Sequence, residues 1–329
     1  MSNFRNSSQT TAVILAAGQG KRMKTQRPKV LTTVLGQEML TYILDSLKQV
    51  GIDRPIVVVG FDGQSVVDLV GDNAVIAWQK EQLGTGHAVQ QALPQLARIQ
   101  GSVIVTNGDV PLISSDFFKA LVNERESTGA AAVVATMILE KPKAYGRIKR
   151  DAEGNISEIV EMRDASPEEL LIREVNTGTY CFESRLLKEF IPKLKNDNAQ
   201  GEFYLTDMIA HLLKAGHKVR SFVTPDPDEF LGINDPSDLV VVEQTLSRQI
   251  RQKHLANGVI IENPETVRIE PHVTIGPRTR IRPNTIIEGY SVIGSDCLLG
   301  PNVLIRNHTL PDGTQFTASG LIGKNKRQS

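Results

Sequence analysis

Short apolar runs alternate with helix-like stretches from residue 11 to about residue 235. The apolar runs are AVILAA, PIVVVG and SVIVTNGD, and the stretches with helical spacing are MLTYILDSLKQV, QSVVDLV and HAVQQALPQL. Continuous apolar strands that alternate with amphipathic helices are typical of βαβ units, in which helices cover both faces of a mostly parallel sheet. We therefore expect an α/β domain whose ligands bind beyond the carboxyl ends of the strands. A connecting helix is predicted over 236–256, with Asp235 as its cap and Pro236 in its first turn.

A different pattern begins near Asn257. Aliphatic residues recur every six positions, and a small residue follows each of them four positions later. The aliphatic positions are Ile269, Ile275, Ile281, Ile287, Ile293, Leu299 and Ile305, and the small ones are Val273, Thr279, Thr285, Ser291, Cys297, Val303 and Thr309. This hexapeptide repeat predicts a parallel β-helix, in which each coil stacks on the next. Cys297 is accordingly expected to point inward and not to act as a nucleophile.

The repeat is short. With three faces per coil, seven hexads correspond to little more than two coils. Residues 310–323 show no period, and an exposed coil end is usually covered. We therefore expect that these residues fold back as a cap or that subunits pack through the short β-helix. A passive evolutionary remnant is an equally good alternative.

Composition limits the classes of function. The 329 residues include 37 basic and 37 acidic side chains, so no overall positive field attracts nucleic acid. The two cysteines are far apart and no Cys/His cluster occurs, which argues against a disulfide framework or a structural zinc site. The segment MSNFRNSSQTT has no apolar core, and no later run approaches a membrane span. We expect a cytoplasmic protein without nucleic-acid or membrane partners.

The first predicted strand leads into a basic loop, LAAGQGKRMKTQRPK. A Walker A motif is excluded because Leu15 stands where it needs its first glycine and Arg22 where it needs Ser or Thr. A dinucleotide-binding motif is excluded because Met23 stands where it needs its third glycine. Glycines that leave backbone N–H groups accessible, followed by several cations, suit a triphosphate. A solvated basic loop explains the glycines equally well.

Further motifs make a specific resemblance. The segments are LAAGQGKRM with PK, QKEQLGTGHA, NGDVPL, YGRI, IVEMRDA, VNTG, NAQGEFYLTD and GIN. In this order and spacing the chain resembles the uridyltransferase half of the bifunctional N-acetylglucosamine-1-phosphate uridyltransferase/glucosamine-1-phosphate acetyltransferase, over nearly its whole length.

The resemblance implies an architecture and a reaction. The architecture is a Rossmann-like nucleotidyltransferase domain over residues 1–234, a connecting helix over 235–256, and a short left-handed β-helix with a tail over 257–329. The reaction is Mg²⁺-dependent nucleotidyl transfer from UTP to N-acetylglucosamine 1-phosphate, which gives pyrophosphate and the cell wall precursor UDP-N-acetylglucosamine. Because the repeat is short, no acetyltransferase activity is expected, and the β-helix is a possible contact between subunits of a homo-oligomer.

The resemblance also assigns site residues. Arg22 would bind the departing phosphates, and Lys29 would bridge the attacking and α phosphates. Asp109 and Asn234 would hold Mg²⁺, and a carboxylate at the end of a strand suits that ion. The nucleotide-binding residues would be Leu15, Ala16, Ala17, Gly18, Gln79, Gly84 and Thr85, and the sugar-binding residues Gly146, Glu161 and Asn176. From the residues alone, the stretch Gly84 to Gly86 is expected to begin a helix that offers free N–H groups and a hydroxyl.

At some positions the sequence allows more than one role for the residue. Several relatives carry an aromatic residue where this chain has Asn107, so contacts to base or sugar can differ there. Tyr204 and Thr206 fit either the sugar pocket or the core. The six histidines form no metal-ligand spacing, and for His87 a role at the helix end is favoured over catalysis. The rival functions are a sister enzyme such as a glucose-1-phosphate thymidylyltransferase, a catalytically silent regulatory homologue, and an acyltransferase that works through the β-helix.

Overall fold

The computed structural model describes residues 10–20, 23, 27–317 and 319–323 of the chain. It divides into two compact units. The first comprises residues 1–32 and 38–235, and the second comprises residues 33–37 and 236–329. No helix in the described part of the chain is long and apolar enough to cross a membrane.

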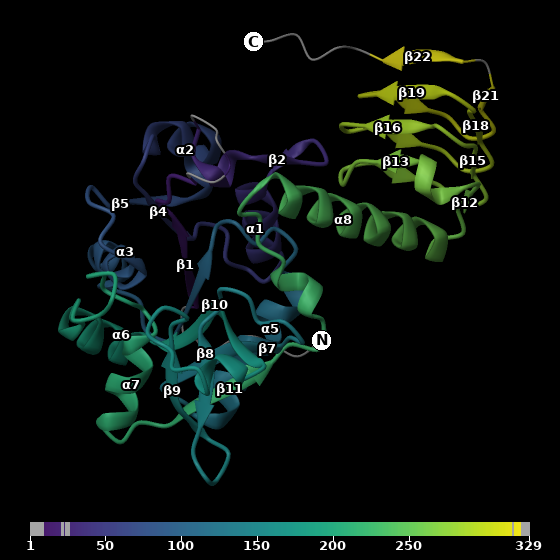
Figure 1. Ribbon diagram of the computed structural model, residues 1–329. Helices are drawn as coiled ribbons and strands as arrows, with labels where there is room; N and C mark the ends of the chain where they lie inside the picture. The colour runs from purple at the N-terminus through teal and green to yellow at the C-terminus, as the bar shows by residue number, and fades with distance from the viewer. Residues whose placement is uncertain (1–9, 21–22, 24–26, 318, 324–329) are drawn as a thin grey trace. The chain divides into compact units, whose positions relative to one another are not determined.

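A nine-stranded sheet forms the centre of the first unit (Figure 1). Seven strands run in the order β11-β7-β10-β6-β1-β4-β5, and β8 and β9 continue from β10. Strand β10 is antiparallel to both β6 and β7, whereas β1 is parallel to β4 and β6. The predicted mostly parallel sheet is thus confirmed. The strands are β1 (Thr11–Ala16), β4 (Ile56–Val59), β5 (Val75–Trp78), β6 (Ser102–Asn107), β7 (Ala132–Ile138), β8 (Arg147–Arg150), β9 (Ile156–Val160), β10 (Glu174–Glu183) and β11 (Val219–Val223).

Helices cover both faces of this sheet, as the alternation predicts. Neighbouring strand residues such as Val13 and Ile14 belong to different apolar clusters, because successive side chains point to opposite faces. One face packs against α3 (Thr85–Gln91), α4 (Leu93–Leu96), α6 (Ser184–Phe190) and α7 (Asp207–Lys214). The other packs against α1 (Met39–Gln49), α2 (Gly63–Val70) and α5 (Ser115–Thr128). Short 3₁₀ turns are η2 (Lys29–Leu31), η3 (Gly71–Asn73), η4 (Glu169–Leu171), η5 (Ile191–Lys193) and η6 (Pro227–Phe230).

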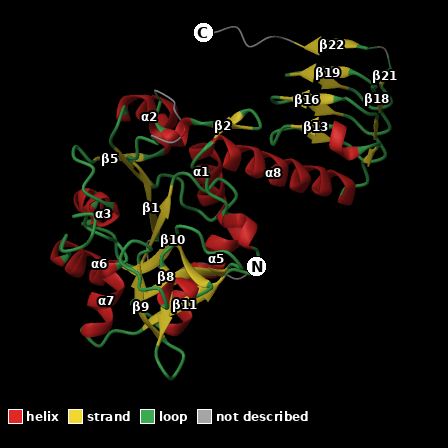
Figure 2. Ribbon diagram, in the orientation of Figure 1, coloured by secondary structure: helices red, strands yellow, loops and turns green. Residues whose placement is uncertain are grey.

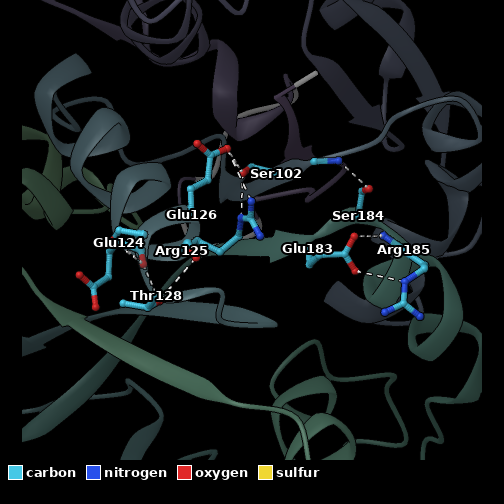
Figure 3. Close-up of polar contacts among 10 residues, drawn as sticks. Ser102, Glu124, Arg125, Glu126, Thr128, Glu183, Ser184 and Arg185 are labelled. Atoms are coloured by element: carbon cyan, nitrogen blue, oxygen red, sulfur yellow. Dashed lines mark hydrogen bonds and ion pairs between the residues drawn. The ribbon is translucent and has the colours of Figure 1, made fainter. Parts of the chain in front are cut away.

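Polar contacts fix the amino end of β6 (Figure 3). Arg125 of α5 is buried and its Nε donates to Ser102 Oγ at 2.8 Å, while that hydroxyl donates to Glu126 at 2.9 Å. Glu183 caps α6 by accepting from the N–H groups of Arg185 and Leu186. The strand anchored in this way ends at Asn107, which belongs to the site described below.

In the second unit, α8 (Pro236–Ala256) is the predicted connecting helix, and three stacks of short parallel strands follow it (Figure 2). All seven aliphatic positions of the repeat are buried, and so are the small ones from Val273 to Val303, Cys297 included, whereas Thr309 is exposed. The short left-handed β-helix is thereby confirmed. The stacks are β12 (Ile260–Ile261), β15 (Arg280–Ile281), β18 (Leu298–Leu299) and β21 (Gln315–Phe316); β13 (Arg268–Ile269), β16 (Ile286–Glu288), β19 (Val303–Arg306) and β22 (Gly320–Gly323); and β14 (Thr274–Ile275), β17 (Val292–Ile293) and β20 (Thr309–Leu310).

The structure corrects the expected length of the repeat and excludes one of the alternatives for its end. In the described part of the chain the β-helix has stacks of four, four and three strands, so it is longer than the expected little more than two coils. Residues 310–323 do not fold back as a cap, because β20, β21 and β22 continue the parallel stacks. Ile281 pairs with Leu299, 18 residues later, but Leu299 pairs with Phe316 only 17 residues later. One residue is missing from the repeat, and a strict six-residue period therefore ends before the β-helix does.

Residues 33–37 join the second unit, although they lie within the first half of the sequence. They belong to the hairpin of β2 (Thr33–Val34) and β3 (Gln37–Glu38). The Leu35 N–H donates to Glu243 of α8 at 3.0 Å, and a Cβ at Gly36 would lie 2.3 Å from the Glu270 carboxylate. Glycine at position 36 is therefore required for this close approach.

Candidate active site

Two adjoining cavities open in the first unit, where β1 and β6 end. Their volumes are about 270 and 200 Å³, and both are lined by Leu15, Thr85 and Asn107. The larger is further lined by Ala17, Gly18, Lys29, Val30, Gln79, Gln82, Gly84, Ala88, Asp109 and Glu202. The smaller is further lined by Ala144, Tyr145, Gly146, Glu161, Asn176, Thr177, Gly178, Tyr180, Leu205 and Thr206.

Lys29 contacts both residues of the predicted metal pair. Its Nζ lies 2.5 Å from Asp109 Oδ2 and donates to Asn234 Oδ1 at 2.9 Å. The Lys29 side chain is 11% exposed and that of Asp109 is 26% exposed, so the ion pair is partly shielded from water. Two oxygens from residues distant in sequence thus converge on one cationic centre.

These oxygens fit Mg²⁺. The Lys29 ammonium marks a point that both oxygens reach, and carboxylate and amide oxygens are the hard donors that this ion prefers. Among the described residues, no group of three or more His, Cys, Asp or Glu side chains could hold a metal. Magnesium sites with one or two protein ligands are completed by water and phosphate oxygens.

Close backbone approaches hold the Lys29 region in place. Gly20 has a φ of +61°, and a Cβ there would lie 2.6 Å from the Cβ of Lys29. Gly108 donates its N–H to Leu15 O at 2.9 Å, and a Cβ there would lie 3.1 Å from the same oxygen. Gly20 therefore acts by packing against Lys29, whereas Gly18 lines the larger cavity.

The predicted base-binding residues lie at the other end of the larger cavity. Gln79 is 3% exposed, and its Nε2 donates to Gly84 O at 3.1 Å. The same nitrogen lies 3.1 Å from His87 Nδ1. Since the amide nitrogen makes both contacts, the Gln79 oxygen is left to accept a hydrogen bond from a ligand.

The start of α3 offers less than the sequence suggested. Thr85 Oγ1 accepts from the Leu205 N–H at 3.0 Å, and the Gly86 N–H donates to Phe203 O at 2.7 Å. A Cβ at Gly84 would lie 2.7 Å from Phe203 O. The expectation of free N–H groups is therefore wrong for Gly86, because residues 203–205 pack on this turn. The Thr85 hydroxyl accepts one hydrogen bond but keeps its own hydrogen to donate.

The smaller cavity holds a carboxylate. Thr206 Oγ1 donates to Glu161 Oε1 at 3.2 Å, and a Cβ at Gly146 would lie 3.5 Å from the Glu161 carboxylate oxygens. Burial raises the pKa of Glu161 above its usual value, and the Thr206 hydrogen bond offsets part of the rise. Thr206 thus belongs to the site, whereas Tyr204 is buried beside it and does not line either cavity.

Asn176 is oriented by its neighbours. Its Nδ2 donates to Tyr180 Oη at 2.7 Å, and its Oδ1 accepts from the Gly178 N–H at 3.1 Å. One amide hydrogen and one oxygen lone pair remain for a ligand. Gly178 has a φ of +79°, and a Cβ there would lie 2.4 Å from the amide nitrogen of Asn107. Asn107 thus occupies the boundary of the two cavities.

Arg147 supports the loop that lines the smaller cavity. It is buried, its guanidinium donates to the carbonyl oxygens of Tyr145 and Lys143, and burial lowers its pKa. These contacts hold the loop before Gly146. The motif YGRI contained this residue and Tyr145, but nothing in the sequence showed that the arginine turns back on its own loop.

The structure brings most predicted site residues together. All but two of the residues predicted to bind nucleotide, metal or sugar line one of the two cavities or contact Lys29. Ala16 is buried beneath the site and lines neither cavity, and Arg22 lies outside the described residues. Gln82, Tyr180 and Leu205 line the cavities without having been predicted.

Comparisons with known proteins show which family this chain resembles. The family model of the MobA-like NTP transferase domain matches residues 12–166. The bifunctional protein GlmU of Geobacillus sp. (strain WCH70) is 45% identical over 308 residues, which are 94% of this chain and 67% of that protein. The bifunctional protein GlmU of Carboxydothermus hydrogenoformans is 43% identical over 94% of this chain and 69% of its own length. This chain therefore spans about two thirds of the length of these relatives.

A solved structure shows the same fold. It is a putative glucose-1-phosphate thymidylyltransferase from Bacillus anthracis in complex with a sucrose, with a TM-score of 0.60 and 21% identity. The match covers 72% of this chain and 95% of the other. The relatives in sequence support the expected transfer of a nucleotidyl group to a sugar 1-phosphate, and the chain belongs to the family of the bifunctional protein GlmU as a nucleotidyltransferase.

Proposed function

We propose that this nucleotidyltransferase transfers UMP from UTP to N-acetylglucosamine 1-phosphate and releases pyrophosphate. One arrangement carries the proposal: two cavities adjoin, and the Lys29–Asp109 pair lies in the larger one. The larger cavity suits a nucleoside triphosphate and the smaller one a sugar. The two substrates would then meet where both cavities share Leu15 and Asn107.

The reaction joins two anions. A sugar phosphate has its second pKa near about 6, so its phosphate is mostly dianionic at neutral pH. One of its oxygens attacks the α-phosphorus of UTP, the bond from that phosphorus to the β-phosphate oxygen breaks, and pyrophosphate leaves in line. No proton has to be removed from the nucleophile. The protein must therefore orient the two substrates and neutralise their charge.

Lys29 would supply a positive charge where the phosphates of the two substrates meet. Its ammonium would stabilise the phosphate oxygens on which charge develops, because a shielded cation acts strongly in a low dielectric. Asp109 and Asn234 would hold Mg²⁺, which when bound would neutralise phosphate charge and orient phosphate oxygens. The role of Arg22 toward the departing phosphates stays a prediction.

Polar groups in each of the two cavities favour UTP and N-acetylglucosamine 1-phosphate as the substrates. The Gln79 oxygen would accept the N3–H of uracil, which cytosine lacks. The Glu161 carboxylate would accept sugar hydroxyls, and the remaining donor and acceptor of Asn176 would bind an N-acetyl group. A cytoplasmic location and a homo-oligomer formed through the second unit also stay predictions.

Pyrophosphate release from UTP and N-acetylglucosamine 1-phosphate tests the proposal. We expect turnover with Mg²⁺ and its loss when EDTA removes the metal. Replacing Lys29 by alanine should lower kcat on the order of 10²-fold, as does removal of one group that stabilises a transition state. The control Lys119→Ala removes an exposed lysine of α5 and should leave kcat unchanged. Near-normal turnover of the Lys29→Ala protein would contradict the assigned role.

A further inference from the structure

His87 contacts the base-binding glutamine, although the sequence suggested only a helix-end role for it. The first turn of α3 places its Nδ1 3.1 Å from Gln79 Nε2. Its Nε2 lies 3.0 Å from the amide nitrogen of Gln91, one turn further along the helix, and that amide nitrogen also lies 3.4 Å from the backbone oxygen of His87. The imidazole therefore connects two carboxamides, and the larger cavity lies at one end of this row.

The Gly84 carbonyl fixes the orientation of the Gln79 amide. A carbonyl oxygen can only accept a hydrogen bond, so the group that faces it at 3.1 Å must be the amide nitrogen. The same nitrogen faces His87, and its second hydrogen is directed to Nδ1. Nδ1 must then carry a lone pair, and the proton of the neutral imidazole lies on Nε2. Gln91 Nε2 faces the ring here, and a neutral imidazole cannot accept at both of its nitrogens. The Gln91 carboxamide must therefore turn over to present its oxygen to that proton, and it then gives up the 3.4 Å contact with His87 O, which is longer than the contact of Gln79 with Gly84 O.

The orientation of the Gln79 amide determines which base it can bind. Both hydrogens of the Gln79 amide are used by Gly84 and His87, and among the described residues none donates to its oxygen. An amide held in this way offers the larger cavity an acceptor only. Uracil presents a donor at N3, whereas cytosine presents an acceptor at N3 and a donor at its exocyclic amine. The opposite orientation of the amide would suit the N3 of cytosine.

We propose that His87 is a positioning residue that selects uracil over cytosine by holding the Gln79 amide with its oxygen toward the base. This inference rests on the proposed function, in which Gln79 contacts the base. His87 itself does not line either cavity. It acts through Gln79, and the Gly84 carbonyl supports the same orientation, so loss of His87 weakens the selection without abolishing it.

Three substitutions separate this role from a general one in packing. His87→Phe keeps a ring near Phe203, which lies 6.2 Å away between ring centroids, but removes the acceptor. His87→Gln places its amide near the former Nε2 and leaves carbon near Nδ1. His87→Asn places an oxygen near the former Nδ1 and preserves an acceptor. His211→Phe on α7 is the control, since the same exchange occurs far along the chain and outside both cavities.

The readout is the ratio of kcat/KM for UTP to that for CTP at saturating sugar phosphate. Since one net hydrogen bond is lost, the ratio should fall about two- to tenfold in the Phe and Gln variants. It should stay near the wild-type value in the Asn and His211 variants. Should His87→Phe fail to fold, His87→Gln gives the same information.

An equal loss with both nucleotides, leaving the ratio unchanged in the Phe and Gln variants, would overturn the inference. So would a wild-type protein that uses UTP and CTP equally well. If the wild-type protein lacks turnover with the sugar phosphate, the proposed function fails. The ratio of the dissociation constants of UTP and CTP, measured by calorimetry on the same variants, then tests His87 independently.

Discussion

Glu161 illustrates at the residue scale how function and stability conflict. In the proposed reaction its carboxyl group accepts sugar hydroxyls most strongly when it is ionised, yet burial raises its pKa because the charged form is poorly solvated. Below the pKa of the unfolded chain, near about 4.3, the carboxyl is protonated in both states. As the pH rises through the higher pKa of the folded state, the folded protein loses stability relative to the unfolded chain.

The substitution Glu161→Gln should therefore stabilise the ligand-free protein increasingly as the pH rises. Melting temperatures of both proteins between pH 4 and 8 measure this, and the difference in favour of the variant should grow with pH. Glu153→Gln is the control, because Glu153 is exposed in a turn and its charge is solvated in both states. A difference for Glu161→Gln that does not change with pH would show that the buried charge carries no cost.

The sequence revealed the types of these site residues but not their mutual contacts. The motifs identified Gln79, Glu161 and Asn176, because each segment has a specific residue pattern. The orientation of the Gln79 amide depends on a histidine whose ring position is set by folding, so His87 could not be assigned from its place in a helix. The free N–H expected at Gly86 was wrong for a similar reason, since residues 203–205 approach only in the folded chain.

At the scale of elements, Gly20, which follows β1, packs against Lys29 at the start of η2. Gly20 has the left-handed φ that glycine tolerates best, and it packs directly against the Lys29 side chain. Gly129, at the end of α5, has the same φ of +61°, but no atom lies within 4 Å of the position that a Cβ would take there. The two glycines therefore share the same φ but differ in their surroundings.

This pair gives a matched test. Gly20→Ala should lower kcat strongly, because the new methyl group would lie 2.6 Å from the Cβ of Lys29 and displace it. Gly129→Ala should leave kcat unchanged and cost about 1 kcal/mol of folding free energy or somewhat more, from backbone strain alone. Steady-state rates and melting curves of both variants provide the comparison. Equal kcat values would mean that the loop does not position Lys29.

The β-helix shows how far a periodic pattern can be followed. The aliphatic column predicted inward residues correctly from Ile269 to Ile305, because each coil repeats the same geometry. The loss of one residue before Leu310 shifts the pattern without ending the stacks, since a turn between short strands can be shortened. A search that allowed one deletion would have recovered Phe316 and Ile322, which pair with Leu299 and Ile305.

At the scale of the molecule, the chain builds a nucleotidyltransferase unit and a β-helical unit. The fold class followed from the apolar pattern, because strand and helix periodicities persist over many residues. The assignment of residues 33–37 to the second unit did not, since it depends on single contacts such as that from Leu35 to Glu243. The substrate likewise depends on the joint lining of two cavities, which composition does not encode.

The central claim is that the two cavities select a uridine nucleotide and an N-acetylated sugar phosphate together. The most direct measurement is a single reaction that contains UTP, dTTP, N-acetylglucosamine 1-phosphate and glucose 1-phosphate at equal concentrations with Mg²⁺, its nucleotide sugars identified by mass spectrometry. The account predicts that UDP-N-acetylglucosamine is the dominant initial product. Dominant formation of dTDP-glucose, or of no nucleotide sugar at all, would contradict it.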